Sequence, residues 1–276
     1  MRKYILLALV PVLSLMFLIR NQEKTDLGSN DNKYKLVFSD EFKGRNGSQP
    51  DTTKWVRSER GPSTWNRWIS RSSKVVYIKD GNLVLRAIPR SYDTSTPDTA
   101  KMLTGAIETY GKFDFQYGKV EVRMKTNVIA GNFPAVWLKP TDQNINGRFS
   151  YGEIDVVETN GYFNRSSHTI HTHQTHILKK AEPTSFEGDI DITRWHIYGM
   201  EWTSDIIRWS VDGKEVGVYR RSTKAEDIAD GQWTFDRPFY LRLNQSVGPG
   251  GFPSRTPQTD KIYETRIDWI RVYQIK

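Results

Sequence analysis

The chain has 276 residues, no cysteine and a formal net charge of +8. The lack of cysteine excludes a disulfide scaffold and a thiolate metal site. Lysine and arginine are scattered and form no block, which argues against a nucleic-acid partner. Nine tryptophans and thirteen tyrosines exceed what an ordinary core needs, and such a surplus in a strand-rich chain suggests flat apolar platforms for sugar rings.

The N-terminal residues predict export. Arg2 and Lys3 precede an almost continuously apolar stretch, residues 4–19. That stretch is long for the apolar part of a signal peptide and short for a membrane span of about 20 residues. The expected division of the chain is a signal peptide or N-terminal membrane anchor over residues 1–25, a flexible spacer over 26–33 and one folded domain over 34–276. Either use of the first segment places the domain outside the cytoplasm, as a periplasmic, cell-surface or secreted protein.

Strand signals dominate from Tyr34 onward. Asp80-Gly81 marks a hairpin turn, and residues 118–125 alternate apolar and charged side chains as a half-exposed strand does. Residues 222–230 are the only segment that predicts a short helix. The other expected strands are residues 74–78, 82–87, 105–110, 113–115, 135–138, 153–158, 169–173, 195–202, 206–211, 215–219, 239–245 and 265–274. Many short strands without alternating helices predict an all-β sandwich or barrel.

Three carboxylates, Glu153, Asp155 and Glu158, lie in one apolar, β-branched segment. Glu153 and Asp155 share a strand face, whereas Glu158 would point to the opposite face of a regular strand. One extra residue in a β-bulge returns Glu158 to the shared face. Like charges this close raise at least one pKa. Double displacement at an acetal uses such a set, and retaining enzymes hold its two carboxyls about 5–5.5 Å apart.

Two other uses of these acids fit less well. A solvated strand face conflicts with the β-branched neighbours. A calcium site conflicts with the linear spacing, because carboxylates along one strand do not wrap an ion as a loop does.

The segment Glu153-Ile-Asp155-Val-Val-Glu158 resembles the Glu-x-Asp-x-x-Glu signature of glycoside hydrolase family 16. Supporting pieces between Val37 and Tyr273 are residues 37–42, 117–123, 133–138, 196–202 and 267–273. The resemblance implies an all-β jelly-roll sandwich of two antiparallel sheets with a concave substrate cleft. It also implies Glu153 as nucleophile, Glu158 as general acid/base and Asp155 as the residue that orients Glu153. No cofactor for catalysis is expected.

The resemblance also implies a set of substrate-binding residues. Trp137 is expected to be a stacking platform, and Asn244 and Gln245 a polar pair on the cleft floor. The full expected set is Trp65, Asn66, Arg67, Trp137, His171, His173, Asn244 and Gln245.

Two metal sites are considered. His171 and His173 would share a strand face, so zinc fits geometrically, although a retaining glycosidase needs no metal for chemistry. The resemblance implies a structural calcium away from the cleft, held by Glu41, the carbonyl of Gly81 and Asp268.

The predicted function is that of a monomeric, retaining endo-β-glycosidase that cleaves a polysaccharide or glycan. The first expected substrate is a β-1,3- or mixed-linked β-glucan. The alternative is an endo-β-galactosidase that acts on poly-N-acetyllactosamine or galactan chains, because residues 60–67 resemble gut-bacterial relatives and residues 156–161 depart from the laminarinase pattern. A non-catalytic carbohydrate-binding module and a transglycosylase are the remaining alternatives.

Overall fold

The computed structural model describes residues 33–95, 98–159, 161, 163–248 and 256–276. Within these residues two short α-helices, α1 (His173–His176) and α2 (Ala225–Ala229), and one 3-10 turn, η1 (Arg90–Tyr92), interrupt the strands. The strands are β1 (Tyr34–Asp40), β2 (Val56–Arg57), β3 (Val76–Lys79), β4 (Asn82–Pro89), β5 (Met102–Glu108), β6 (Gly118–Thr126), β7 (Asn132–Pro140), β8 (Asn144–Ile145), β9 (Arg148–Phe149), β10 (Gly152–Glu158), β11 (Arg165–Thr172), β12 (Thr184–Asp189), β13 (His196–Trp202), β14 (Ile206–Val211), β15 (Lys214–Arg220), β16 (Phe239–Val247) and β17 (Tyr263–Ile275). In this part of the chain no helix is long and apolar enough to cross a membrane.

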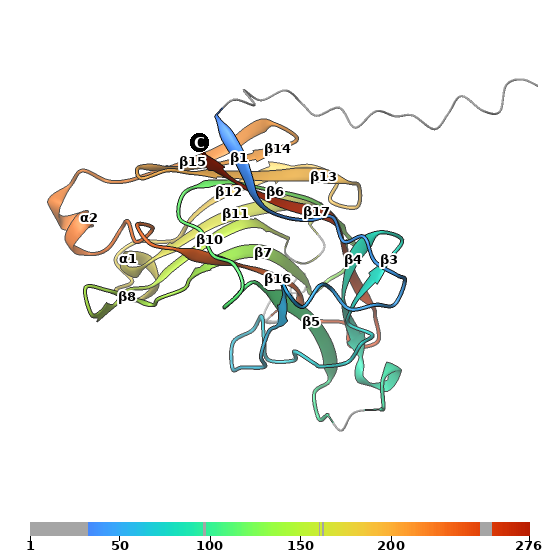
Figure 1. Cartoon of the computed structure of the whole chain (residues 1–276). Coiled ribbons are helices and arrows are strands. Elements are labelled where there is room, and N and C mark those ends of the chain that lie inside the picture. Colours follow the sequence, from blue (N-terminus) through green and yellow to red (C-terminus); the bar gives the residue numbers. More distant parts are fainter. Residues whose placement is uncertain (1–32, 96–97, 160, 162, 249–255) are drawn as a thin grey trace, which may run out of the picture. The chain divides into compact units, whose positions relative to one another are not determined.

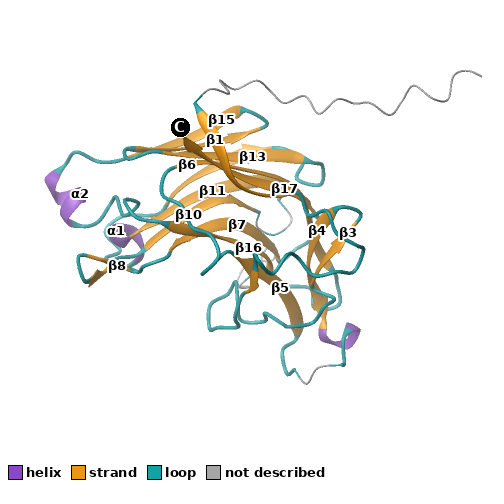
Figure 2. Cartoon of the chain, viewed as in Figure 1, coloured by secondary structure: helices purple, strands orange, loops and turns teal. Residues whose placement is uncertain are grey.

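The strands form two antiparallel layers, which confirms the predicted jelly-roll class (Figures 1 and 2). One layer has the order β12-β11-β10-β7-β16-β5, and the other has the order β4-β17-β6-β13-β14-β15. Pairing between β4 and β5 joins them into one hydrogen-bonded network. The β8–β9 hairpin stands apart as a small two-stranded sheet.

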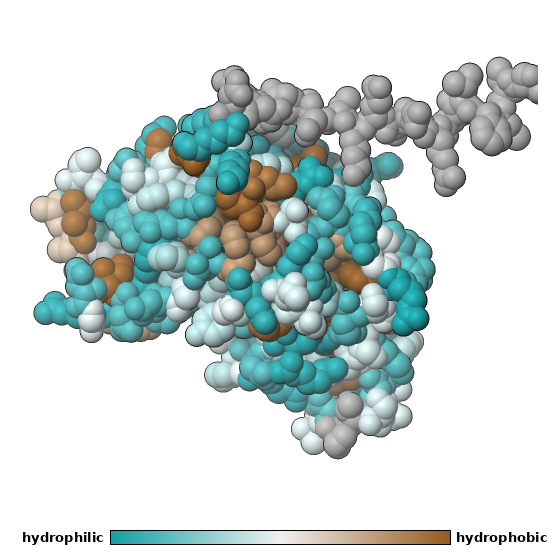
Figure 3. Space-filling view, in the orientation of Figure 1, coloured by the Kyte–Doolittle hydropathy of each residue, from teal (hydrophilic) through white to brown (hydrophobic). Residues whose placement is uncertain are grey.

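The core lies between the two layers, and alternation is clearest in one strand that faces it. In β6 every second residue is buried, from Gly118 to Thr126, so its charged side chains reach the outside. Large fully buried side chains from both layers meet in the middle, among them Tyr198, Trp202, Trp209, Phe235 and Phe239. The face of the β12–β5 layer that points away from this core is called the outer face below. The space-filling view is hollowed on that side (Figure 3).

Helix prediction was incomplete. The segment 222–230 does contain a helix, α2, but α1 was not predicted, and residues 113–115 form only a bridge between Phe115 and Phe239. The helix α1 begins where strand β11 was expected to continue. Thr172 caps it through a reciprocal pair of hydrogen bonds with Thr175, so the chain turns away from the sheet before His173.

The predicted β-bulge is present in β10. Asp155 is opposite Trp137 on β7, yet Val157 is opposite Val136, so Val156 is the extra residue. Glu158 is opposite Ala135, two positions from Trp137, and therefore reaches the same outer face as Asp155. Both valines are fully buried behind the strand.

Candidate active site

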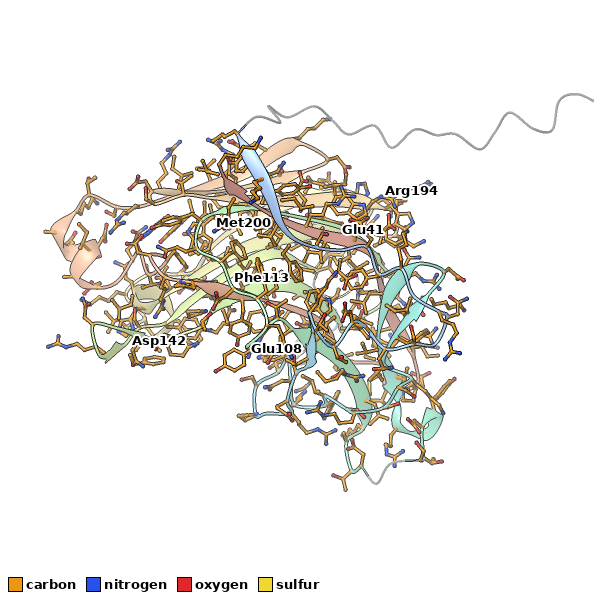
Figure 4. The ribbon with its side chains drawn as sticks, in the orientation of Figure 1. Glu41, Glu108, Phe113, Asp142, Arg194 and Met200 are labelled. Atoms are coloured by element: carbon orange, nitrogen blue, oxygen red, sulfur yellow. The ribbon has the colours of Figure 1, made fainter. Side chains whose placement is uncertain are left out.

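Two rows of paired side chains cross the outer face. In the first row Asp155 on β10 is next to Trp137 on β7, followed by Arg242 on β16 and Glu108 on β5. Glu108 lies on the lower side of the layer in Figure 4. In the second row Glu153 is opposite His171 on β11 and in contact with Lys139 on β7. Strand pairing thus collects side chains that are far apart in the sequence around the predicted catalytic acids.

Glu153 is surrounded by groups that stabilise its ionised form. The Tyr151 hydroxyl donates a hydrogen bond to Glu153 Oε2 at 2.7 Å, and Lys139 Nζ donates to the same oxygen at 3.2 Å. His171 Nε2 lies 3.8 Å from Glu153 Oε1. Burial raises the pKa of Glu153, but Lys139, His171 and the two hydrogen bonds outweigh it, so the pKa falls below its usual value.

The pKa values of the other two acids, Asp155 and Glu158, are shifted upward. Burial and the charge of Glu153 raise the pKa of Asp155 well above its usual value. Burial raises the pKa of Glu158 well above its usual value too, and the charges of Asp155 and Glu153 add to the effect. Among the described residues no hydrogen bond joins Asp155 to Glu153, and Asp155 instead faces Glu158, a contact that adds to the raised pKa of Glu158. The contact with Asp155 thus favours the protonated form of Glu158, while Lys139 and Tyr151 hold Glu153.

Side chains from the interior fix the bulge that aims these acids. Trp209 Nε1 donates a hydrogen bond to the carbonyl oxygen of Asp155 at 2.9 Å. His168 Nδ1 lies 2.6 Å from the carbonyl oxygen of the bulged Val156, and its Nε2 lies 3.0 Å from the Ser166 hydroxyl. Burial lowers the pKa of His168 to about 4, so the neutral ring donates to the carbonyl at neutral pH. Hydrogen bonds from these two interior side chains therefore hold the backbone of the bulge in place.

Trp137 does not lie open as a sugar platform. Only 5% of the residue is exposed, and Nε1 donates to Asn244 Oδ1 at 2.8 Å. The Trp65 ring packs edge-on at 5.0 Å, and the Arg242 guanidinium lies 5.1 Å from the Trp137 ring centre. Trp65 and Arg242 thus cover most of the ring, whereas Trp65 itself is half-buried.

We expect Trp137→Ala to lower the free energy of unfolding by about 3–5 kcal/mol, because truncation leaves a cavity among packed rings. Urea denaturation measures this loss. Trp65→Ala, at the more open ring, is the matched variant and is expected to cost less stability. An unchanged unfolding midpoint for Trp137→Ala, with weaker sugar binding, would restore the platform interpretation.

Asn244 and Gln245 do not form a pair on one face. Asn244 lies on the outer face, where it accepts the hydrogen bond from Trp137. Gln245 is fully buried on the interior side, bonded to Asn132, to the carbonyl of Ser246 and to Thr265. The prediction for Gln245 is wrong because adjacent residues of a strand point to opposite faces.

The loop residues next to Trp65 are engaged within the protein. Asn66 packs against Gly61, and Arg67 Nη2 donates to the carbonyl oxygen of Gly248 at 2.7 Å. The loop is joined to β16, because the Ser246 hydroxyl donates to the carbonyl oxygen of Trp65. The structure therefore brings Trp65 to the acids and turns Asn66 and Arg67 toward their own neighbours.

The histidines do not assemble the zinc site that was considered. His173 lies in α1, where its Nδ1 accepts a hydrogen bond from the Tyr151 backbone at 3.4 Å, so it does not share a strand face with His171. One ligand atom each of Glu153, Asp155 and His171 does lie within 4.8 Å of the others. The positive charge at this cluster is already supplied by Lys139.

Both carboxylates that were expected to bind calcium lie beside an arginine. Glu41 Oε1 accepts from Arg271 Nε at 2.9 Å, and Asp268 Oδ2 accepts from Arg123 Nη1 at 2.5 Å. Both carboxylates are thus already paired with arginines.

Sequence comparison decides the family. Residues 34–275 match the family model described as "Beta-porphyranase A-D, GH16 domain". The chain belongs to glycoside hydrolase family 16. This membership confirms the resemblance drawn from the acidic motif and its flanking segments.

Family 16 relatives with different activities match almost equally well. Keratan-sulfate endo-1,4-beta-galactosidase of Sphingobacterium multivorum is 32% identical over 88% of this chain and 56% of its own length. Glucan endo-1,3-beta-glucosidase A1 of Niallia circulans is 32% identical over 87% of this chain and 38% of its own length. The solved laminarinase from Rhodothermus marinus is 25% identical with a TM-score of 0.74, covering 88% of this chain and 98% of that one. The chain thus spans roughly half or less of the first two relatives.

Sequence reasoning missed two residues at this family 16 site, Lys139 and Tyr151. Both carried a signal. Lys139 follows the apolar run of β7 two positions after Trp137 and so shares its face, and a lysine in a buried strand is rare unless it is paired. Tyr151 is two positions before Glu153, immediately before β10 begins.

Proposed function

We propose that the chain is an endo-acting, retaining β-glycosidase with Glu153 as nucleophile and Glu158 as general acid/base. One observation carries the proposal: two glutamates on a single bulged strand have pKa values displaced in opposite directions. Environments that separate two carboxyl groups in this way assign one to the ionised role and the other to the protonated role.

The reaction follows from these two protonation states. The Glu153 carboxylate attacks the anomeric carbon, while the glycosidic C–O bond breaks and Glu158 gives its proton to the leaving oxygen. The Glu158 carboxylate then takes a proton from water, whose oxygen attacks the same carbon and releases Glu153. Two inversions retain the anomeric configuration. Both steps use carboxyl groups and water and need no cofactor.

Two substrate classes are supported. A β-1,3- or mixed-linked β-glucan is favoured by the glucanase relatives and by the laminarinase fold match. A β-linked galactan or poly-N-acetyllactosamine chain is favoured by the porphyranase description of the family model and by the keratan-sulfate relative. Reducing-sugar release from laminarin, mixed-linked β-glucan, porphyran, agarose and keratan sulfate separates the two classes. Release from none of them would contradict the proposal.

Product analysis distinguishes this function from its alternatives. Hydrolysis yields shorter chains with one new reducing end per cut, whereas a transglycosylase yields longer chains from an oligosaccharide donor. A non-catalytic binding module would retain the polysaccharide and release nothing. The acids are withdrawn from water and their pKa values are shifted in opposite directions. Because burying carboxylates is costly, this arrangement favours catalysis over sugar binding alone.

We also propose that the domain over residues 34–276 is exported. The support is the apolar stretch at residues 4–19, which lies outside the described residues. Fractionation of expressing cells, with the N-terminus of the exported protein sequenced, distinguishes a cleaved signal peptide over residues 1–25 from a retained membrane anchor.

The structural calcium implied by the family stays a prediction, and the structure argues against it at the expected residues. We expect a chelator to shift the unfolding midpoint by less than about 1 °C, because arginines already pair with both carboxylates. Differential scanning fluorimetry with EDTA and with added calcium measures this. A calcium-dependent rise of several degrees that Asp268→Asn abolishes would show that the site forms.

A further inference from the structure

Lys139 is a buried lysine with its charged end inside the site. It is 8% exposed and lies on the outer face of β7, in contact with Glu153 and the Tyr151 ring. Burial lowers the pKa of its ammonium group, and the charge of Glu153 opposes that effect. A lysine is rarely buried this far unless it is paired, so its position needs an explanation beyond packing.

Its two partners join it to the nucleophile. Lys139 Nζ lies 3.2 Å from Glu153 Oε2 and 3.6 Å from the centre of the Tyr151 ring. The Tyr151 hydroxyl binds the same carboxylate oxygen, and its ring stacks on His176 at 3.8 Å. Glu153 Oε2 therefore receives two donors that also contact each other. Such a closed arrangement fixes the direction of the carboxylate.

The pairing opposes strong repulsion. Asp155 and Glu158 face Glu153 from its own strand; Asp155 is buried and Glu158 is half-buried. His171 approaches the other carboxylate oxygen from β11. The charged and titratable groups around Glu153 are Lys139 on β7, Tyr151 before β10, Asp155 and Glu158 on β10, His171 on β11, His176 on α1 and Arg242 on β16. Lys139 is the only lysine among them, and it touches the carboxylate directly.

We propose that Lys139 is a positioning residue that, with Tyr151, keeps the Glu153 carboxylate ionised and aimed for attack. This inference rests on the proposed function, because it assumes that Glu153 is the nucleophile. It gives Lys139 and Tyr151 the role that the sequence assigned to Asp155, and it leaves Asp155 to pair with Glu158. Without the ammonium group, a buried carboxylate beside two other acids would take up a proton at higher pH.

The test is the acidic limb of the pH profile of kcat/KM. Lys139→Met keeps the length and apolar stem of the side chain and removes the charge. We expect its acidic limb to move upward by at least about one pH unit, which lowers the rate below that limb about tenfold. Lys139→Arg keeps a cation and is expected to return the limb toward that of the wild type. Tyr151→Phe removes one donor and should shift the limb in the same direction by less.

Lys119→Met is the matched control. Lys119 is also a strand lysine paired with a glutamate, Glu121, at 2.5 Å, but it lies on β6 in the other layer. The acidic limb of the Lys119→Met pH profile is expected to match that of the wild type. A merely structural role for Lys139 predicts a lower rate with an unmoved limb. That result, or an equal shift in Lys119→Met, would overturn the proposal. If Lys139→Met does not fold, the position of the acidic limb in Tyr151→Phe and in Lys139→Arg tests the proposal instead.

A second readout needs no turnover. Carbon NMR of protein with labelled glutamate side chains follows the Glu153 carboxyl directly, and Glu153→Gln assigns its signal. A raised Glu153 pKa in Lys139→Met supports the proposal even if no polysaccharide is cleaved, in which case only the proposed function fails. An unmoved Glu153 pKa in an active enzyme overturns the role of Lys139 alone.

Discussion

Glu153→Gln is expected to reduce kcat on the cleaved polysaccharide at least about 1,000-fold and to leave the fold intact. An amide cannot attack the anomeric carbon, whereas its oxygen can still accept the hydrogen bond from Tyr151. Reducing-sugar release measures the rate, the thermal unfolding midpoint measures the fold, and affinity electrophoresis in polysaccharide gels measures sugar binding. All three are needed, because a loss of rate is informative only in a folded variant that still binds.

Two controls sharpen this result. Glu187→Gln removes an exposed carboxylate from β12 of the same layer, where it pairs with Arg165, and should keep full activity. Azide added to a Glu153→Ala variant should restore turnover and yield an α-glycosyl azide, because the small anion attacks in place of the carboxylate. If Glu153→Gln retains more than a few per cent of the activity, Glu153 is not the nucleophile.

Glu158→Ala is expected to abolish the alkaline limb of the pH profile. In the wild type the rate falls at low pH as Glu153 takes up a proton and at high pH as Glu158 loses one. Its raised pKa keeps Glu158 protonated at a pH where Glu153, with its lowered pKa, is ionised, so a bell-shaped profile results. The two limbs are macroscopic properties of a coupled set that includes Asp155.

Aryl glycosides with good leaving groups separate this role from a structural one. Such substrates need no proton at the departing oxygen, so Glu158→Ala should recover their glycosylation rate while it remains slow on the polysaccharide. Pre-steady-state release of the aryl group measures that step. If the rate on the activated substrate falls as much as the rate on the polysaccharide, the proton donor is another residue. His171, which lies beside Glu153 and Asp155, is then the candidate to test.

Local patterns in the sequence correctly predicted the strand that carries the three acids and the bulge within it. The spacing Glu153-x-Asp155-x-x-Glu158 required a bulge if all three acids were to share a face, and the bulge is present at Val156. The alternating strands and the absence of long helices likewise predicted the sandwich. These features depend on residues near one another in the chain, where the periodicity of a strand is sufficient.

Features that depend on pairing between distant segments were not predicted. Lys139 reaches Glu153 because β7 and β10 pair in one register, and no local pattern states that register. Gln245 was misplaced for the opposite reason: the alternation rule was not applied to it, although it follows Asn244 directly. His173 was misplaced because the cap made by Thr172 ended the strand early.

Because of the bulge, β10 contains one residue more than the register of the sheet requires. The strand needs only four steps of the sheet between Glu153 and Glu158, but the chain supplies five, and Val156 takes up the difference. Deleting Val156 would therefore leave a regular strand with all three carboxyl groups still on the outer face. Deleting Ile154 instead would set Glu153 directly beside Asp155, so the two would point to opposite faces. The motif can thus be shortened at one point without changing which way its acids face.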